Sequence, residues 1–346
     1  MESFFNHIVS VVMKFLVDNR AHTHPAYNLA LEEYLLRHAD PTHEYVLLYR
    51  NASSVVVGKH QNILEEVNWP YVREAGVKVV RRISGGGTVY HDTNNMNFSF
   101  ITRYDSHKVG NYPLFNAPVI AALNSLGVPA MANHRNDIIA EGKKISGNAQ
   151  FSSTKMMMSH GTLLIEADLE RLRQAIQPPI DKISSNGVKS YRSQVENIRH
   201  WLGQDLSLQT IEEALICHIF EVFTAEAAPR YQLDEAAWQA IEALVQEKYL
   251  GWAWTLGRNP ACTIERSRPL GLGILTATIH IREGRIQELA LEAPHITPEV
   301  LQAVSQSLLQ SPYEYTQIQQ QLRHLNNTQA SVDQWAAAIC DFVWPI

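Results

Sequence analysis

The sequence predicts an α+β protein, with a large domain of mixed β-sheets flanked by helices and a small α+β domain after it. Three observations lead to this prediction. A chain of 346 residues is long enough for one large and one small domain, and its 45% hydrophobic content is typical of globular proteins. Strand-like and helix-like patterns are mixed over the first 250 residues. After Gly251 the pattern changes to one hairpin followed by helices.

The expected elements of the large domain begin with a strand at Lys14–Val17 and a helix over Pro25–His38, since proline is tolerated in the first turn of a helix. A second helix, Phe115–Leu126, is ended by Gly127 and Pro129. Short alternating or β-branched runs predict further strands at Tyr45–Tyr49, Ser54–Val57, Val77–Arg81, Asn97–Thr102, Ile138–Ile139, Lys143–Gln150 and Gly161–Ile165.

Helical patterns predominate in the rest of the large domain, and the small domain then begins with strands. The expected helices are Leu169–Ile176, a pattern around Ile211–Thr224 and a pattern around Asp234–Lys248. In the small domain, Gly271–Ile281 and Arg285–Leu291 predict a hairpin around Glu283 and Gly284. Thr297 and Pro298 then have the residue types of an N-cap and a first helical position, and two or three helices are expected to follow.

Composition excludes several classes of protein. The chain has 29 Lys and Arg against 35 Asp and Glu, so it lacks the basic excess of a nucleic-acid-binding protein. Its three cysteines are widely spaced and form no CxxC pair, which favours a reduced, cytoplasmic protein. The apolar start of the chain lacks a basic n-region and is too short to span a membrane. Residues 1–12 are therefore interpreted as an N-terminal extension.

A glycine-rich segment is the strongest candidate for ligand binding. Arg81–Asp92 reads R-R-I-S-G-G-G-T-V-Y-H-D. Three consecutive glycines allow close approach of backbone to a ligand, and successive N–H groups can form an anion-binding nest. Arg82 could add a charged contact to a phosphate or carboxylate. The spacing fits neither a P-loop nor a dinucleotide-binding turn, and a simple tight turn between strands is the alternative interpretation.

A second candidate segment combines an Asn-Asp pair with two lysines. Asn136 and Asp137 open a predicted strand, and they offer the oxygen ligands that Mg²⁺ takes together with phosphate and water. Lys143 and Lys144 follow on the next strand, where successive side chains point to opposite faces. One of the two lysines is therefore expected to point toward a site. The alternative is that both are solvated surface lysines.

Two further segments carry polar groups that fit either a site or an ordinary structural role. His160 stands beside Gly161 at a predicted strand start, where it would lie at a site rim or serve as a structural histidine. Gly187–Ser193 reads G-V-K-S-Y-R-S and is also consistent with a basic surface loop. Met156–Met158 would pack in the core or line an alkyl-binding wall.

Taken together and in order, these segments resemble the lipoate–protein ligase family. The family's patterns are met by R-R-x-S-G-G-G-x-V-x-H-D at Arg81–Asp92, R-N-D at Arg135–Asp137, K-[IV]-S-G-x-A at Lys144–Ala149 and H-G-T-L-L at His160–Leu164. Val55–Asn62 and Gly187–Ser193 match two further stretches, and Trp252–Pro260 resembles the W-x-W and G-x-x-P entrance to the C-terminal domain. Each motif is weak alone, but the ordered set is specific. It covers the chain from about Met13 onward.

The resemblance implies a biotin/lipoate ligase-like fold and a role for each site residue. Lys144 would be the catalytic lysine, reaching the acyl carboxylate and the α-phosphate, and Asp137 would bind Mg²⁺. The residues expected to bind substrate and adenylate are Arg82, Ser84, Gly85, Gly86, Gly87, Val89, His91, Asn136, Asp137, Ser146, Gly147 and His160. The catalytic domain would span residues 13–250, a linker 251–257 and an accessory domain 258–346.

The implied reaction uses ATP and Mg²⁺ to convert lipoate to lipoyl-adenylate and pyrophosphate. The lipoyl group then passes to a lysine of a lipoyl carrier, which would be the glycine-cleavage H protein, an E2 lipoyl domain of a 2-oxoacid dehydrogenase, or both. Neither nucleic acid nor membrane is expected as a partner. The preferred carrier, the choice between lipoate and octanoate, and the oligomeric state do not follow from the sequence.

Two alternatives have the same fold but not the same reaction. One is a lipoyl or octanoyl transferase that does not activate the free acid; its cysteine-dependent form would need a reactive thiol, and Cys217 has a helical, core-like setting. The other is a non-catalytic binder of lipoyl carriers. The chain also departs from the family's H-D-x-G-N pattern, since Asn94 stands in place of the glycine. Asn is the next-best residue for positive φ, so we expect the turn to persist.

Overall fold

The computed structural model describes residues 12–178, 182–191, 193–203, 206–270, 273–328 and 339–344. These residues form two compact units, and each unit is assembled from three separate stretches of the chain. Unit 1 comprises the described residues of Met1–Ala52, His91–Asp168 and Arg192–Leu244, and unit 2 those of Ser53–Tyr90, Leu169–Tyr191 and Val245–Ile346. The predicted extension falls almost entirely on residues 1–11, which lie outside the described ranges, as do Arg192 and Gly271.

Unit 1 is built on an eight-stranded mixed sheet with the order β12-β1-β2-β6-β10-β9-β8-β7. Its strands are β1 (Lys14–Val17), β2 (Glu44–Tyr49), β6 (Met96–Arg103), β7 (Ala130–Ala132), β8 (Ile138–Ala140), β9 (Lys143–Ser152), β10 (Met156–Leu163) and β12 (Arg230–Tyr231). β1 pairs in parallel with both of its neighbours, and every pairing from β2 to β7 is antiparallel. The mixed sheet agrees with the fold class predicted from the sequence.

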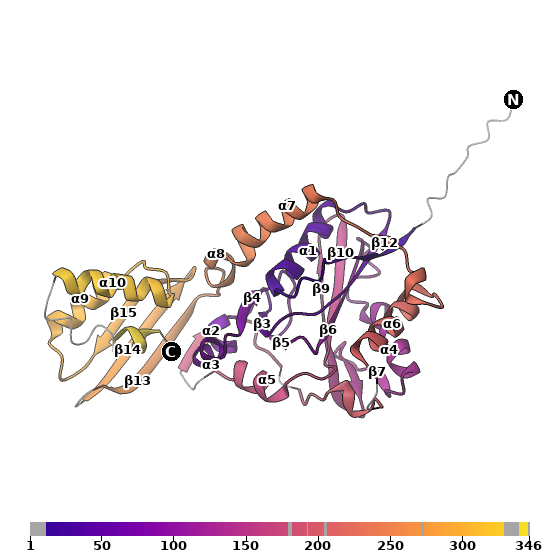
Figure 1. Cartoon of the computed structure of the whole chain (residues 1–346). Helices are drawn as coiled ribbons and strands as arrows, with labels where there is room; N and C mark the ends of the chain where they lie inside the picture. The colour runs from indigo at the N-terminus through magenta and orange to yellow at the C-terminus, as the bar shows by residue number, and fades with distance from the viewer. Residues whose placement is uncertain are drawn as a thin grey trace. The chain divides into compact units, whose positions relative to one another are not determined.

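Helices cover both faces of this sheet (Figure 1). They are α1 (Pro25–His38), α4 (Tyr112–Ser125), α6 (Leu208–Phe220) and α7 (Glu235–Leu244), with short 3₁₀ turns at Ile198–His200 and Ala225–Ala227. α4 and α6 pack on one face, where Phe98 and Phe100 of β6 join their apolar side chains in one core. α1 lies on the other face and packs against α7. Because strand side chains alternate, that second face receives Asn97 and Ser99 of the same strand, both buried.

Unit 2 contains two smaller sheets. The first has the order β4-β3-β5, and the second, which is antiparallel, has the order β11-β13-β14-β15. The strands are β3 (Ser54–Val57), β4 (Lys78–Arg81), β5 (Val89–His91), β11 (Lys182–Ser185), β13 (Cys262–Leu270), β14 (Gly273–Arg282) and β15 (Arg285–Glu292). The last residue of β5, His91, belongs to unit 1.

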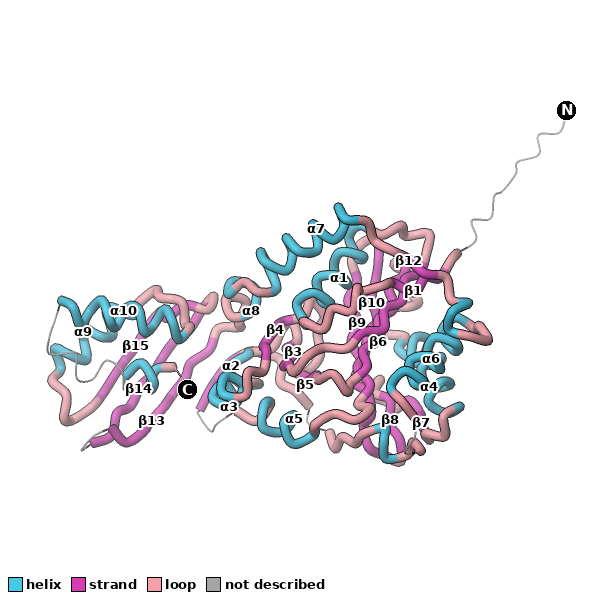
Figure 2. The backbone as a smooth tube through the Cα atoms, in the orientation of Figure 1, coloured by secondary structure: helices cyan, strands magenta, loops and turns pink. Residues whose placement is uncertain are grey.

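Unit 2 also contains helices, which are shown with its strands in Figure 2. They are α2 (Ile63–Glu66), α3 (Trp69–Glu74), α5 (Leu169–Ala175), the π-turn Val245–Tyr249, α8 (Trp252–Thr255), α9 (Pro298–Leu308) and α10 (Tyr315–Thr328). One continuous apolar core joins α2 and α3 with β13–β15 and with α9 and α10. The predicted linker 251–257 coincides with α8 and its two flanking ends. Its role as a domain boundary stays a prediction.

Several local predictions are confirmed, and the bounds of one strand are corrected. The strands Lys14–Val17 and Ser54–Val57 have the predicted bounds, and Glu283–Gly284 forms the predicted hairpin turn with positive φ. The strand expected at Gly161–Ile165 instead begins at Met156, so the three methionines lie on β10. None of the helices in the described ranges is long and apolar enough to span a membrane.

The turn after His91 persists, but not for the predicted reason. Neither Asn94 nor Asn95 has a positive φ. The Asp92 carboxylate accepts hydrogen bonds from the N–H of Asn94 at 2.9 Å and of Asp168 at 2.9 Å, and Asn95 N–H donates to the Asp92 carbonyl at 3.1 Å. An aspartate-bridged turn of this kind needs no glycine.

Candidate functional site

The predicted site residues are divided between the two units. Unit 1 contains His91, Asn136, Asp137, Lys144, Ser146, Gly147 and His160, and unit 2 contains Arg82, Ser84, Gly85, Gly86, Gly87 and Val89. The chemistry of each set follows from the contacts within its own unit.

Lys144 is held in place by its backbone and paired through its side chain. It lies at the start of β9, where its N–H donates to the Gln194 carbonyl at 2.9 Å and its carbonyl accepts from Glu196 N–H at 3.0 Å. Its ammonium Nζ is 2.9 Å from Asp137 Oδ1, and the side chains of Lys144 and Asp137 are 24% and 13% exposed. The pair is therefore fixed at one end and accessible to a ligand at the other.

A local irregularity of β9 aims the Lys144 side chain. The β8–β9 register shifts between Ile138 and Ile139, and such a bulge redirects the side chains beside it. The Lys144 side chain consequently lies over Gly147, where an added Cβ would come within 3.0 Å of both Cε and Nζ. Gly147 is thus the residue that makes room for the lysine. Lys143 instead pairs with Glu196, Nζ to Oε2 at 2.7 Å, so the two neighbouring lysines have different partners.

The Asn136–Asp137 turn is tightly ordered by amide side chains. Asn136 adopts a left-handed conformation with φ of 68°, which asparagine tolerates better than most residues. Asn133 Oδ1 accepts from the N–H of Arg135 and of Asp137, and Asn148 Nδ2 donates to the Asn136 carbonyl at 2.8 Å. Among the described residues there is no cluster of three metal-ligating side chains. The single Asp137 carboxylate matches a Mg²⁺ ion that draws its other ligands from phosphate and water.

Ser146 points away from the other candidates of unit 1. It is buried, and successive residues of a strand face opposite sides, so Ser146 and Gly147 lie on opposite faces of β9. Gly147 pairs with Thr162, on the α1 face of the sheet, whereas Ser146 pairs with Leu163, which belongs to the core under α4 and α6. The substrate contacts predicted for Ser146 and Gly147 both stay predictions. Gly147 in addition packs against the Lys144 side chain.

His91 is bound on both sides by protein groups. Its Nδ1 lies 2.9 Å from Asn51 Nδ2, and its Nε2 lies 2.8 Å from Thr162 Oγ1. Thr162 donates its own proton to Asn97 Oδ1, so Thr162 Oγ1 accepts from the histidine. Asn51 Oδ1 accepts from Asn28 Nδ2, which leaves the Asn51 amide group to donate to Nδ1. These roles fix His91 as the neutral tautomer with its proton on Nε2.

His160 forms a buried pair with Glu32, an acidic residue that the sequence did not single out. Its Nδ1 is 3.1 Å from Glu32 Oε1, and the Tyr49 hydroxyl donates to the same carboxylate oxygen at 3.1 Å. Glu32 is 1% exposed, and a buried carboxylate requires such partners. The only sequence signal was an acidic pair, Glu32 and Glu33, inside the otherwise apolar stretch of α1.

The glycine turn of unit 2, defined as Ser84–Gly87, closes around the Arg82 guanidinium. Arg82 Nε donates to Ser84 Oγ at 3.0 Å, and Nη2 donates to the carbonyls of Gly85 at 2.6 Å and Gly87 at 2.7 Å. Among the three glycines only Gly86 has a positive φ, 85°, and it is exposed. The main-chain carbonyls of the turn therefore point inward to Arg82. The ligand contact predicted for Arg82 stays a prediction.

A second loop of unit 2 seals the glycine turn. Ser190 Oγ accepts from Thr88 N–H and from Gln61 Nε2, both at 2.9 Å, and donates to the Glu66 carboxylate. An added Cβ on Gly87 would lie 3.2 Å from Ser190 Oγ, so a larger residue would push the docked loop away. The Gly187–Ser190 stretch, which the sequence left open as a surface loop, is therefore docked on the turn. Ser190, Gln61 and Glu66 were not predicted, because nothing local links residues so far apart in the chain.

The described thiols are poor candidates for nucleophiles. Burial raises the pKa of Cys262 and of Cys340 to about 11, so both stay protonated at neutral pH. Cys217 lies half-buried on α6, and its predicted role in core packing stays a prediction.

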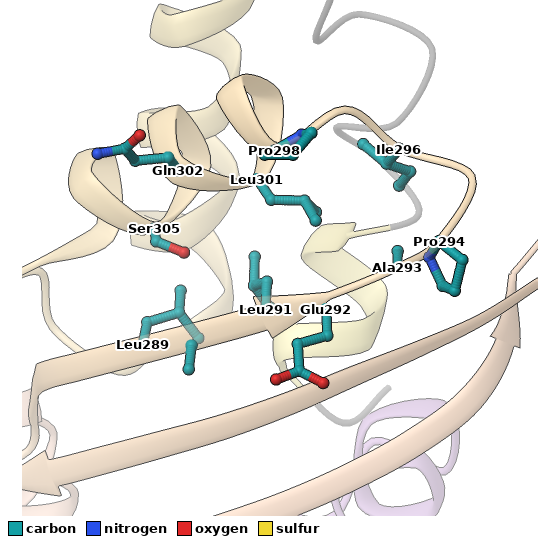
Figure 3. A pocket seen from close by; sticks show the side chains of 11 residues that line it. Leu289, Leu291, Glu292, Ala293, Pro294, Ile296, Pro298, Leu301, Gln302 and Ser305 are labelled. Carbon is teal, nitrogen blue, oxygen red and sulfur yellow. The ribbon is translucent and has the colours of Figure 1, made fainter.

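A separate cavity lies in the C-terminal part of unit 2. It has a volume of about 640 Å³ and is lined by β15 and α9 residues such as Leu291, Glu292 and Leu301 (Figure 3). None of the predicted site residues lines it.

Comparisons with known proteins agree with these observations. Residues 24–220 match the family described as the lipoyl protein ligase A/B catalytic domain, and residues 259–340 match the bacterial lipoate protein ligase C-terminus. Lipoate-protein ligase LplJ of Bacillus subtilis is 38% identical over 90% of this chain and 94% of its own length. Lipoate–protein ligase 1 of Staphylococcus aureus is 42% identical over 80% of this chain and 83% of its own. A crystal structure of lipoate-protein ligase A bound with ATP is 25% identical, with a TM-score of 0.57 over 70% of this chain and 96% of that one.

Proposed function

This chain belongs to the lipoate–protein ligase family, and we propose that Lys144 and Asp137 supply the charge that activates lipoate with ATP. The protein is an enzyme that joins lipoate to protein, as its relatives are named for doing. The observation that carries the residue assignment is the partly exposed ion pair between Lys144 Nζ and Asp137 Oδ1 at 2.9 Å.

The first step requires a cation because it brings two anions together. A carboxylate oxygen of lipoate attacks the α-phosphorus of ATP, the bond from that phosphorus to the bridging oxygen breaks, and pyrophosphate leaves. Lys144 would neutralise the acyl carboxylate and the α-phosphate as they approach, in a site where fixed charges need little reorganisation. The ion pair with Asp137 supports this role, because it holds the Lys144 ammonium in a fixed position before the substrate arrives.

The second step transfers the acyl group to the carrier. The amine of a carrier lysine attacks the carbonyl carbon of lipoyl-adenylate, an amide bond forms, and AMP leaves with the electron pair of the broken anhydride bond. The attacking nitrogen loses a proton. Lys144 would stabilise the oxyanion that develops on the carbonyl oxygen.

The glycine turn would bind the adenylate through its backbone. Gly86 is exposed and has no side chain, so ligand atoms can approach the main chain there. Arg82 and Ser84 would keep the turn in shape from inside, and Val89, half-buried on β5, would add apolar contact. In unit 1, His160, Gly147 and Asn136 would contact substrate. His91, already bound on both nitrogens, would orient the residues around it.

Mg²⁺ and the carrier belong to the same proposal. The ion would be held by Asp137 with ATP oxygens, and it would supply charge neutralisation for the departing pyrophosphate. The acceptor would be a lysine of a lipoyl carrier, either the glycine-cleavage H protein or an E2 lipoyl domain. Free, buried cysteines favour a reducing compartment, and we expect the reaction in the cytoplasm.

One experiment separates this reaction from its alternatives. The protein is incubated with lipoate, ATP, Mg²⁺ and an apo lipoyl domain, with pyrophosphate release and the intact mass of the domain as readouts. A ligase gives both pyrophosphate and lipoylated domain. Transfer only from supplied lipoyl-adenylate would identify a transferase and contradict the proposal. Neither product, with the domain bound, would identify a non-catalytic binder.

A further inference from the structure

Arg81, the residue before Arg82, has an unusual environment in unit 2. It is fully buried at the end of β4, and no carboxylate among the described residues pairs with it. Its five N–H donors go to oxygens of uncharged groups instead. Nε and Nη2 donate to the Thr255 carbonyl at 3.0 and 2.8 Å, Nη2 also to Asn259 Oδ1 at 2.7 Å, and Nη1 to the carbonyls of Gly58 at 3.0 Å and Gln61 at 2.8 Å.

Only a guanidinium can make this arrangement. It is planar and offers five donors at fixed angles, whereas a lysine offers three from a single atom. Burial, with the nearby Arg82 charge, lowers the pKa of Arg81 to about 10, so the group still carries its proton at neutral pH. A buried cation without a counter-ion is stable only if its hydrogen bonds are complete. Loss of any one acceptor should therefore disturb the others.

On one side, Arg81 fixes the loop that supports the glycine turn. The carbonyls of Gly58 and Gln61, which Arg81 binds, belong to this loop. Lys59 N–H donates to the Ser84 carbonyl at 2.9 Å, and Gln61 Oε1 accepts from Thr88 Oγ1 at 2.9 Å. An added Cβ on Gly58 would lie 2.1 Å from the Gly86 carbonyl oxygen, so the loop backbone is in direct contact with the turn.

On the other side, Arg81 holds the segment Trp252–Asn259. Trp254 Nε1 donates to the Arg81 carbonyl at 2.7 Å, and Asn259 Oδ1 accepts from Ile63 N–H at 2.9 Å as well as from Arg81. The same segment contacts the β14–β15 hairpin, because an added Cβ on Gly284 would lie 2.7 Å from Gly257 Cα. One buried side chain thus connects the start of the C-terminal region with the support of the glycine turn.

We propose that Arg81 is a positioning residue for the ligase reaction: through it, the Trp252–Asn259 segment holds the glycine turn in the shape that binds the acyl-adenylate. Arg81 touches no reacting atom in this assignment. It acts through Gly58 and Gln61. The functional part rests on the proposed ligand role of the turn, and the experiment below tests the coupling separately from that role.

The test changes the far end of the connection, in the full chain. Asn259→Leu keeps the size of the side chain but removes the acceptor for Arg81 and Ile63. Amide hydrogen exchange without ligand is read at Lys59 and Thr88, whose N–H groups bond to Ser84 and Ser190. We expect both amides to exchange at least about tenfold faster and the KM for lipoate to rise by a similar factor. Asn259→Asp retains an oxygen acceptor for both donors, so both measurements should stay close to those of the parent protein.

Arg266→Met is the matched control for general destabilisation. Arg266 is also a buried arginine of unit 2 that donates to main-chain carbonyls, those of Phe342 and Val343, and it is not among the residues described above as holding the glycine turn. This variant should lose stability while Lys59 and Thr88 exchange as in the parent.

The outcomes distinguish the two claims. Unchanged exchange at Lys59 and Thr88 in Asn259→Leu, or equal acceleration in Arg266→Met, would overturn the positioning role. Accelerated exchange in Asn259→Leu with an unchanged KM for both lipoate and ATP would support the coupling. It would also overturn the ligand role of the glycine turn.

Discussion

Lys144 in unit 1 and Arg82 in unit 2 are cations of predicted site motifs, but their surroundings differ. The Lys144 ammonium is partly exposed and faces one carboxylate, whereas the Arg82 guanidinium is buried and donates to the carbonyls of its own loop. An ion pair can exchange one anion for another when substrate arrives. A guanidinium enclosed by its own backbone instead fixes a shape. The comparison teaches that the charged residues of predicted site motifs can differ in role: one stays partly exposed and open to a ligand, and another holds its own loop in shape.

The largest expected effect comes from the cation assigned to chemistry. Lys144→Ala should lower the rate of adenylate formation by at least about a hundredfold and also block transfer, since it removes a preorganised charge. Pyrophosphate release measures the first step, and the intact mass of a carrier given lipoyl-adenylate measures the second. Lys143→Ala is the matched control and should change either rate less than about fivefold. Equal losses in the two variants would show that the assignment is wrong.

A smaller but clear effect is expected where shape matters. Gly87→Val adds a branched side chain at a position where even a Cβ would lie 3.2 Å from Ser190 Oγ, so the docked loop must move. Lipoate affinity measured by calorimetry should fall at least about tenfold while the protein stays folded, because overpacking costs about 1–3 kcal/mol. Gly203→Ala is a control, since its added methyl meets nothing within 4 Å. Unchanged lipoate affinity in Gly87→Val would remove the turn from the site.

A substitution of His91 tests whether unit 1 also contains a motif residue that holds the structure and takes no part in the chemistry. Its two nitrogens are occupied, so His91→Gln should cost stability, about 1–3 kcal/mol from the unsatisfied Asn51 amide, and leave the shape of the pH–rate profile unchanged. Urea denaturation and kcat measured across pH give the two numbers. A lost limb of the profile with unchanged stability would make His91 an acid or base instead.

The smallest effect is expected for the partly exposed ion pair between Lys143 and Glu196. The hydrogen bond from Lys143 lowers the pKa of Glu196, so the pair stabilises the fold above the ordinary carboxyl pKa and loses this contribution as pH falls through the lowered value. Lys143→Ala should therefore cost under about 1 kcal/mol at neutral pH, and the difference should shrink below about pH 4. A difference in urea stability that grows with acidity would contradict this reading.

Local physics made much of the fold predictable. Pro25 marked the start of α1, and a run of three valines marked β3. β10 was predicted five residues short because Met156, Met157 and Met158 are all buried, on both faces of the sheet, and so show no alternation. Lys143 and Lys144 have different partners, and a β-bulge contributes to this difference as well as simple alternation; that one of them points to a site stays a prediction.

Candidate site residues could be named from the sequence where residue type and order were specific, and not where contacts join distant segments. Lys144, Asp137 and the glycine turn were identified from motifs. The sequence did not single out Ser190, Glu66 or Asn259, because their hydrogen bonds join segments more than 100 residues apart in the chain. Glu32 had a weak signal as a charge in an apolar helix, but its partner His160 could not be read from spacing.

The interleaving of the two units has a consequence for how the chain is made. Strand β1 sits between β2 and β12, so the large sheet cannot be completed until Tyr231 has emerged from the ribosome, more than 200 residues after Val17. By then two of the three stretches of unit 2 have emerged, but Thr255 and Asn259, which accept hydrogen bonds from Arg81, have not. Nascent chains should therefore carry Arg81 without these acceptors until the Thr255–Asn259 segment has emerged. Because the large sheet closes late and through contacts between distant residues, we expect chaperones to assist folding during synthesis.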